Sequence, residues 1–309
     1  MKGLFSFALI LAVVNVAVGA DVADLDTALQ NTYYACVDID QDLNDMKKMA
    51  GINTAVSGVA TGLGVGATVA GFSKSKIDKQ TNQWKQELEQ MIQNQNSQYE
   101  NTMYQTINIS GADLRQILTE HENTKALQLQ KDIADAEKRS KKLGNWRTGL
   151  LAGNTTVNVV GAIMSNKNKV DSDLQHKVDN CVKNLKSLKS AIVRARIEEI
   201  DVSEAQNIYN ECADYEYLDL SPITKRAKGA TVSSTIGAIA AGVGTATSIA
   251  ANSDKMHGDD KEKTLNVAAN TLAVGGSIAS ATATVFNATQ IAAIKKVVNV
   301  SEKCTKVLK

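Results

Sequence analysis

The chain is poor in the residues on which β-rich domains usually depend. Among its 309 residues there is one proline, Pro222, and aromatic residues make up only 4%. Because β-rich domains of this size carry more aromatic residues and more turn prolines, the composition favours helices. Apolar residues make up 43% of the chain, which is enough to bury a sizeable core.

The chain also lacks an excess of charge of either sign. It carries 34 basic and 33 acidic residues, and loss of Lys2 with a signal peptide would leave the two equal. A neutral chain without a strongly basic patch has no electrostatic reason to bind nucleic acid. We therefore expect no nucleic-acid partner.

Motifs for catalysis, cofactors and metals are missing as well. In the stretch "GVATGLGVGATVAGF", residues 58–72, Gly66 and Gly71 are followed by Phe72 and not by the lysine of a phosphate-binding loop, and no βαβ pattern surrounds them. The stretch "DIDQDLND" begins like a calcium loop, but Leu43 and Met49 stand where the loop needs glycine and glutamate. No convergent catalytic set is visible, so we expect a non-enzymatic protein without cofactor or metal.

The first twenty residues, "MKGLFSFALILAVVNVAVGA", have the layout of a secretory signal peptide. Lys2 is the positive region, an apolar run follows, and Val18 and Ala20 form a small-residue cleavage site. The alternative is an uncleaved anchor helix. The pattern predicts an exported protein located in the periplasm, at the cell surface or outside the cell.

Four nearly uncharged segments alternate with polar ones: 52–72, 143–165, 229–252 and 264–294. The polar block 73–142 carries apolar positions at helical spacing on both sides of a turn at Gly111, which predicts a projecting coiled-coil hairpin. A charged turn around Gly258 separates the last two uncharged segments.

The order of segments repeats along the chain. Each half contains a helix with a cysteine, an uncharged segment, a turn, a second uncharged segment and another helix with a cysteine. We therefore expect two antiparallel helical hairpin units after the signal peptide 1–20. The first covers 21–198 and includes the arm 73–142, and the second covers 199–309.

The four cysteines fit this plan as two disulfides. Export places them in an oxidising compartment, and none forms a CxxC pair. Cys36 and Cys181 are about equally far from the Gly111 turn, and Cys212 and Cys304 are equally far from Gly258. Residues that face each other in an antiparallel hairpin share this property, so we predict the bridges Cys36–Cys181 and Cys212–Cys304.

Small residues recur four positions apart in the uncharged segments, which would line one face of a helix. Such a face lets two backbones pack closely, in the manner of a glycine zipper, and offsets the cost of glycine in helices. The predicted packing residues are Gly58, Gly62, Gly66, Ala70, Gly149, Gly153, Gly161, Ser234, Ala238, Gly242, Ala246, Ala269, Ala273, Ser277 and Ala281.

Two other interpretations of these segments stay open. Local alternation of Val, Thr and Gly would suit a sheet, although the flanking patterns are helical. Each segment is also long enough to cross a bilayer. Its hydropathy is weak, however, and Asn154, Asn158, Asn266 and Asn270 would need hydrogen-bond partners in lipid.

The sequence therefore predicts an all-α, elongated protein of antiparallel helical hairpins with Gly/Ala-rich, closely packed core segments. The function we expect is that of an exported, non-enzymatic structural or protein-interaction protein of the cell envelope. Its partner would be another protein or a second copy, bound through helices. The alternative is a membrane-active protein of the α-helical pore-forming type, whose Gly/Ala-rich hairpins insert into a bilayer.

Overall fold

The computed structural model describes residues 24–103, 112–253 and 260–309. A first helix over 24–36 precedes the others, and 93% of the structure is helical, with no strand in the described ranges. The labelled elements are α2 (Ile39–Met103), α3 (Ala112–Lys167), α4 (Ser172–Ile197), α5 (Ser203–Cys212), the 3₁₀ helix η1 (Ala213–Tyr217), α6 (Ser221–Ala251) and α7 (Asp260–Leu308).

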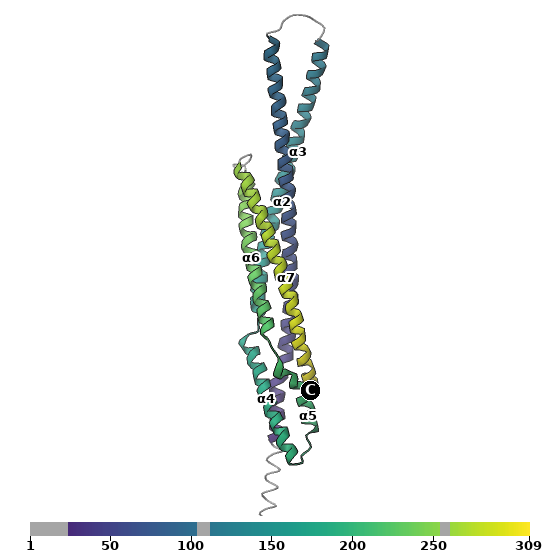
Figure 1. The fold of residues 1–309 in the computed structure, drawn as a ribbon, viewed down its shortest axis with the longest axis vertical. Coiled ribbons are helices and arrows are strands. Elements are labelled where there is room, and N and C mark those ends of the chain that lie inside the picture. The colour runs from purple at the N-terminus through teal and green to yellow at the C-terminus, as the bar shows by residue number, and fades with distance from the viewer. Residues whose placement is uncertain (1–23, 104–111, 254–259) are drawn as a thin grey trace, which may run out of the picture. The chain divides into compact units, whose positions relative to one another are not determined.

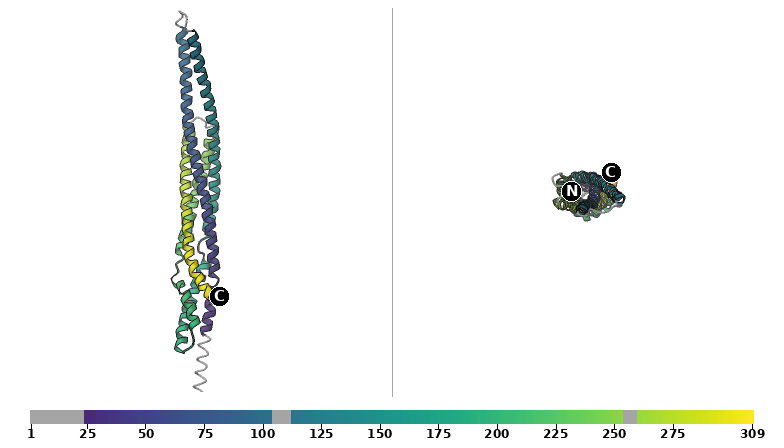
Figure 2. Two further views of the ribbon diagram at one scale, coloured as in Figure 1. Left: turned by 90° about the vertical axis from the view of Figure 1, so that its right-hand side faces the viewer. Right: turned by 90° about the horizontal axis from the view of Figure 1, so that it is seen from above.

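The expected all-α fold is confirmed, and the sheet interpretation of the uncharged segments is wrong. Long helices pack against one another, and Figures 1 and 2 show α2 and α3 side by side in two perpendicular views. The signal peptide 1–20 and the two predicted turns at Gly111 and Gly258 lie outside the described residues.

Contacts divide the chain into two compact units that each combine segments from both halves of the sequence. Unit 1 contains the described residues up to 57, together with 160–234 and 282–309. Unit 2 contains 58–159 and 235–281. This grouping differs from the successive units 21–198 and 199–309, because α2, α3, α6 and α7 each run through both compact units.

The first helical hairpin has the antiparallel register that the cysteine spacing predicts. In unit 1 the Cys36–Cys181 disulfide joins Cα atoms 4.9 Å apart. In unit 2, Lys85 of α2 forms a 2.6 Å ion pair with Glu137 of α3. The midpoint of each pair falls within the connection 104–111, as antiparallel pairing about one turn requires.

The second hairpin follows the same rule. The Cys212–Cys304 disulfide joins Cα atoms 4.5 Å apart, and the Tyr215 hydroxyl lies 2.8 Å from the hydroxyl of Ser301. In unit 2, Gly276 packs against the backbone of Ala241. The midpoints of these pairs fall within 254–259. Both predicted disulfides are confirmed, and they indicate an oxidising, extracytoplasmic environment.

Unit 1 has a conventional apolar core. Leu43, Leu185, Leu188 and Ile294 are fully buried in one cluster that also includes all four half-cystines. Tyr215 is almost fully buried there, and its burial raises the pKa of the phenol to about 12. The two disulfides therefore lie in the larger of the two buried apolar clusters that the described residues form.

Removing the Cys36–Cys181 disulfide should destabilise the protein but leave the antiparallel pairing of the second hairpin intact. Both bridges close long loops, and the chain-entropy model assigns about 4–5 kcal/mol to loops of this length. We expect the Cys36→Ser, Cys181→Ser double variant to lose a large part of this amount in chemical unfolding followed by circular dichroism. A peptide map without reductant should still contain the Cys212–Cys304 peptide. Mixed connectivity in the unmodified protein would contradict the register.

Candidate functional site

The buried residues of unit 2 recur at alternating intervals of three and four. On α2 the residues at these intervals are Ala60, Gly64, Ala67, Gly71 and Lys74, and Ala70 is buried beside them. The other helices follow the same rule, with Ser140, Gly144, Arg147, Leu151, Asn154 and Asn158 on α3, Gly237, Ala241, Gly244 and Ser248 on α6, and Asn266, Ala269, Ala273, Gly276 and Ser280 on α7, where Asn270 is also buried. An average repeat of 3.5 residues is typical of coiled-coil packing.

The predicted packing residues fall on several faces of their helices, because a spacing of four drifts away from a repeat of 3.5. Buried among them are Ala70, Gly161, Ser234, Ala269 and Ala273. The half-buried ones are Gly66, Gly153, Ala238, Gly242, Ser277 and Ala281. The exposed ones are Gly58, Gly62, Gly149 and Ala246.

The closest approaches of helices in unit 2 occur at glycines that the four-residue spacing does not select. A Cβ atom on Gly64 would lie 2.5 Å from the Ser277 hydroxyl and 3.1 Å from the Ser277 Cα. A Cβ atom on Gly237 would lie 3.0 Å from the side chain of Asn158. Gly71 and Gly144 are similarly crowded by Asn270 and Asn252. The sequence signal that could have identified these crowded glycines is the recurrence of small or polar residues at alternating intervals of three and four.

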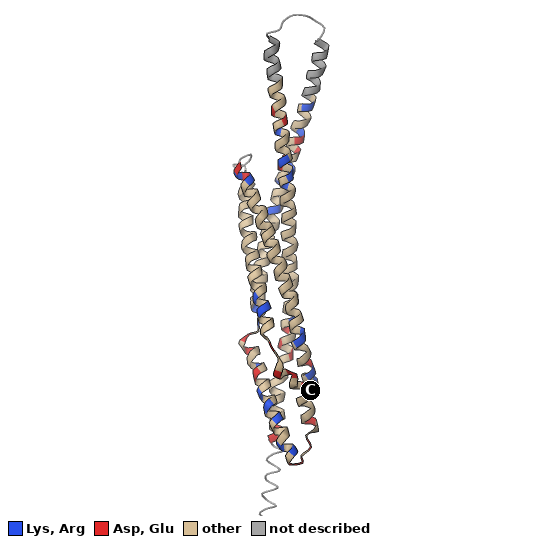
Figure 3. Cartoon of the chain, in the orientation of Figure 1, with Lys and Arg blue, Asp and Glu red and all other residues tan. Residues whose placement is uncertain are grey.

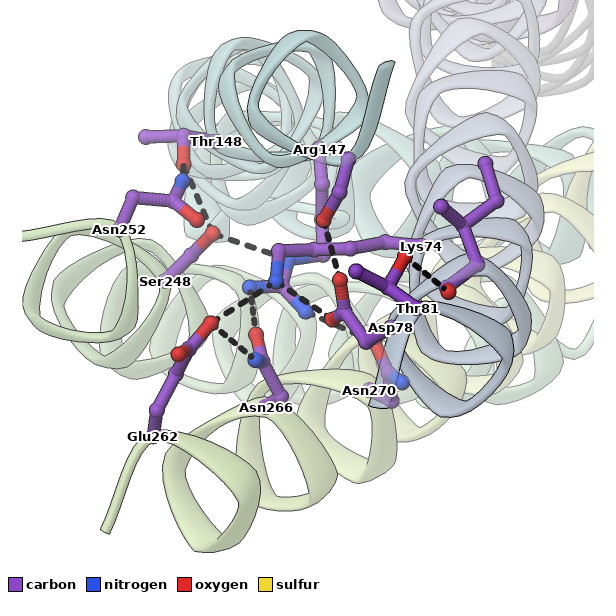
Figure 4. A network of polar contacts seen from close by, with 12 residues as sticks. Lys74, Asp78, Thr81, Arg147, Thr148, Ser248, Asn252, Glu262, Asn266 and Asn270 are labelled. Atoms are coloured by element: carbon purple, nitrogen blue, oxygen red, sulfur yellow. Dashed lines mark hydrogen bonds and ion pairs between the residues drawn. The ribbon is translucent and has the colours of Figure 1, made fainter. Parts of the chain in front are cut away.

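Arg147 lies at the centre of a buried polar network formed by α3, α6 and α7 (Figure 4). Its side chain is fully buried. Nε donates to the Ser248 hydroxyl over 2.9 Å, and the two terminal nitrogens donate to the amide oxygens of Asn270 (3.0 Å) and Asn266 (2.7 Å). Burial lowers the pKa of Arg147, while the charges of Asp78 and Glu262 act in the opposite direction.

Lys74 of α2 joins the same network. It is almost fully buried, and its ammonium group pairs with Asp78 at 2.7 Å and with Glu262 of α7 at 3.2 Å. Ser140 of α3 also donates to Asp78. Two buried cations therefore face two carboxylates, so that the network carries no net charge.

A second polar layer connects α3 to α7 within unit 2. The Asn158 amide donates to the Asn154 side-chain oxygen over 2.6 Å and to the Ser280 hydroxyl over 2.9 Å. The Asn154 amide nitrogen is buried and has no hydrogen-bond partner among the described residues. The four asparagines that need hydrogen-bond partners in an apolar surrounding are Asn154, Asn158, Asn266 and Asn270. Most of the hydrogen bonds they need are thus formed inside the protein.

The outward surface of unit 2 has the opposite character. Outside the arm 73–142, twelve large apolar side chains are exposed in unit 2: Val59, Val65, Val69, Phe72, Trp146, Val159, Ile236, Ile239, Val243, Ile249, Val267 and Ile278. Figure 3 shows no charged residue along the central stretches of α6 and α7, over residues 229–251 and 264–294. Apart from Leu151 and the partly buried Leu150, the apolar cluster inside this unit consists of alanines. Outside the arm 73–142, unit 2 is therefore polar inside and apolar outside.

We call the four runs without any charged residue the charge-free segments: 49–73, 148–166, 229–253 and 264–294. Arg147 and Lys74 directly flank two of them, and Glu262 lies two residues before the last. By length and composition, two of the described helices, Asp24–Asn94 and α6, contain a window apolar enough to be a candidate membrane span, whereas α3 and α7 do not. Only 33% of the apolar window is buried in each, whereas the core helix of a soluble protein is mostly buried.

The described residues form no evident metal site. No group of three metal-binding side chains occurs in the described ranges. A polar groove of about 700 Å³ lies beside the buried network in unit 2, lined by Asp78, Glu137 and Glu262 among others. Searches of protein-family models, curated proteins and solved structures find no match to this chain.

Replacing two neighbouring glycines of α2 should have opposite effects. Gly64→Ala places a methyl group against the α7 backbone at Ser277, and such overpacking costs about 1–3 kcal/mol. Gly62→Ala has no atom within 4 Å of its new Cβ, so it should gain about 1 kcal/mol from helix propensity. Thermal unfolding should show a lower midpoint for the first variant and a higher one for the second. Equal shifts would contradict the observed packing register.

Arg147→Met should destabilise unit 2, because three buried oxygen acceptors lose their donor and two carboxylates lose a cation. We expect the free energy of unfolding to fall by about 3 kcal/mol. Arg147→Lys should recover less than half of the loss, since an ammonium cannot bond all three acceptors at once. Arg139→Met at an exposed position of α3 is the matched control and should be nearly neutral. A neutral Arg147→Met variant would contradict the role of the network.

Proposed function

We propose that this protein is an exported, non-enzymatic protein of the cell envelope that is embedded in a bilayer by its four charge-free segments. The observation that carries the proposal is the inverted polarity of unit 2. Asn158 and Ser280 lie inside and bond each other, while Ile239 and Ile278 point outward and are more than 60% exposed. Lipid tails suit such a surface, and an internal network suits such polar groups.

Water is a poor solvent for this arrangement. Soluble monomers seldom expose apolar patches larger than a few hundred Å². In unit 2 large apolar side chains project from all four long helices, and the charge-free segments carry no charge to keep them in solution. A bilayer removes this cost because the exposed side chains then contact hydrocarbon.

The charge-free segments also have a suitable length. The shortest, 148–166, spans roughly 28 Å as a helix, and the hydrocarbon core of a bilayer is about 30 Å thick. Arg147 and Lys74 are the first charges beyond two of these segments. Charges at such positions lie near the lipid headgroups. Their burial in a network of balanced charge further lowers the free-energy cost of placing them close to the hydrocarbon.

Modest hydropathy is compatible with this proposal. A segment whose inner face carries Asn154 and Asn158 has a low average hydropathy, even when its outer face is fully apolar. Small residues and interhelical hydrogen bonds hold membrane helices together, because lipid provides no hydrophobic force between them. Gly64 and Gly237 provide the close approach, and Asn158 with Ser280 provides a hydrogen bond.

The order of the cysteines supports four crossings. If each charge-free segment crosses once, Cys36 precedes the first crossing, and Cys181 and Cys212 lie between the second and third. Cys304 follows the fourth crossing. All four cysteines then lie on the side of the exported N-terminus, where disulfides form. Residues 74–147 and 254–263 lie on the other side.

The polar arm is the part that would meet a protein partner. Within 73–142, the ion pairs Lys85–Glu137 and Lys125–Glu87 hold α2 and α3 together. The alternative function is pore formation, which is favoured by the polar interior and by the unpartnered amide nitrogen of Asn154. The two functions differ in whether ions or small molecules pass through the bilayer.

The mature protein should bind tightly to vesicles of phosphatidylcholine in a flotation assay. Ile239→Arg places a cation on the outer face of a charge-free segment, and this costs about 2.5–3.5 kcal/mol near the bilayer centre. We expect binding to fall by roughly a hundredfold. The matched control is Ile197→Arg at the end of α4, where the side chain is 75% exposed outside the charge-free segments. That variant should bind normally.

Two results would change the conclusion. Failure of the unmodified protein to float with vesicles, or equal binding of both arginine variants, would contradict a bilayer-embedded protein. Release of an entrapped dye by the unmodified protein would favour pore formation over anchoring. Circular dichroism of each variant would establish that its helices are intact.

A further inference from the structure

Each charge-free segment ends at basic residues on its unit 1 side. On α2 these are Lys47 and Lys48, and on α7 they are Lys295 and Lys296. We call the complete set the basic collar: Lys47, Lys48, Lys167, Lys169, Lys225, Arg226, Lys228, Lys295 and Lys296. All nine residues belong to unit 1, and four separate helical stretches contribute to the set.

The collar has little acidic compensation. Of its nine described residues, only Lys48 lies within ion-pair distance of a carboxylate, at 3.3 Å from Asp45 on the exposed surface. Asp219 interacts with Lys225 at longer range, and Arg226 donates to the Thr289 carbonyl oxygen. The side chains of Lys167, Lys225, Lys228, Lys295 and Lys296 are exposed.

Two of the charged residues that flank the opposite ends of the charge-free segments are buried. There Lys74 is paired with Asp78 and Glu262, and Arg147 is buried among neutral acceptors. Within this buried network, two cations thus face two carboxylates. Exposed basic residues occur near these ends too, at Lys138, Arg139, Lys141 and Lys142. The collar differs from them in its place, because it lies where the charge-free segments meet the disulfide-containing part of the chain.

We infer that the basic collar binds the phosphate groups of anionic phospholipids in the leaflet on the cysteine-bearing side. This inference rests on the proposed function, because the charge-free segments must lie in the bilayer to bring the collar to headgroup level. Lysine side chains at the end of a membrane helix extend toward the headgroups, with the alkyl chain in the apolar region. Each basic residue near an anionic surface contributes about a fivefold preference for it.

The test compares vesicles of phosphatidylcholine alone with vesicles that contain phosphatidylglycerol. The collar variant carries Lys167→Gln, Lys228→Gln, Lys295→Gln and Lys296→Gln. The matched control removes the same charge from exposed lysines away from the collar, by Lys183→Gln, Lys186→Gln, Lys306→Gln and Lys309→Gln. All proteins keep both disulfides.

We expect the unmodified protein to prefer the anionic vesicles by at least tenfold at low salt. The collar variant should lose most of this preference, and the control variant should lose less than about threefold. Equal binding of the unmodified protein to both vesicles would overturn the collar while leaving the bilayer proposal intact. Equal losses in the two variants would also overturn it. Absence of binding to either vesicle would overturn the proposed function itself.

Free phosphate is the other source of the same chemistry. If the collar recognised inorganic phosphate and not a lipid surface, millimolar phosphate would abolish the preference for anionic vesicles at constant ionic strength. We expect phosphate to have no more effect than chloride, because a collar spread over four helical stretches suits an extended anionic surface. Specific competition by phosphate would overturn the inference.

Discussion

The polar contacts between α3 and α7 are the constraint on which unit 2 depends. Arg147 contacts Asn270, and Asn158 contacts Ser280, so the paired residues are 123 and 122 positions apart. A constant difference means that the two helices run parallel, and the hairpin turns then require α2 and α6 to run the opposite way. Breaking this register would leave buried amides and a buried guanidinium without partners, at a cost of about 1–3 kcal/mol for each group.

The two units solve the packing problem in different ways. Unit 1 buries leucine, isoleucine and two disulfides, as a secreted protein does in water. Unit 2 buries glycine, alanine, serine and asparagine and exposes valine and isoleucine. The same four long helices pass through both units, yet the core is apolar in unit 1 and made of small and polar residues in unit 2. The simplest physical cause is that each helix passes from water into lipid along its length. This contrast is the main support for a bilayer around the charge-free segments.

Charge follows the same division along the helices. Lysine and arginine residues stand at both ends of the charge-free segments. In unit 2, Lys74 pairs with Asp78 and Glu262 in a buried network, whereas most of the basic collar lies outside ion-pair distance of a carboxylate. An uncompensated set of cations costs stability through mutual repulsion unless counter-ions are near. Anionic headgroups would supply such counter-ions, which links the charge pattern to the inverted polarity without requiring a further protein.

Much of the fold can be predicted from the sequence, because its strongest signals are local or symmetric about a turn. Low proline and aromatic content favours helices, and the positions of Cys36, Cys181, Cys212 and Cys304 relative to two turns predict both disulfides. The packing face is harder to predict. Gly58, Gly62 and Gly64 are glycines of the same uncharged segment, yet of these three only Gly64 packs against α7. Small residues are so frequent in these segments that they fit both a spacing of four and a repeat of 3.5, so the sequence alone does not select the buried face.

The candidate site needs tertiary structure for a further reason. Asn154, Asn158, Asn266 and Asn270 are visible in the sequence as polar residues within uncharged helices, but their partners are more than a hundred residues away. Which asparagines bond Arg147 depends on the parallel register of α3 and α7, and no local pattern encodes it. By itself the sequence determined the helical class, the two hairpins and the disulfide pairing. Only the tertiary structure decided which helix faces are buried. The buried face of each helix depends on how its side chains fit and hydrogen-bond to those of several neighbouring helices, which are distant in sequence.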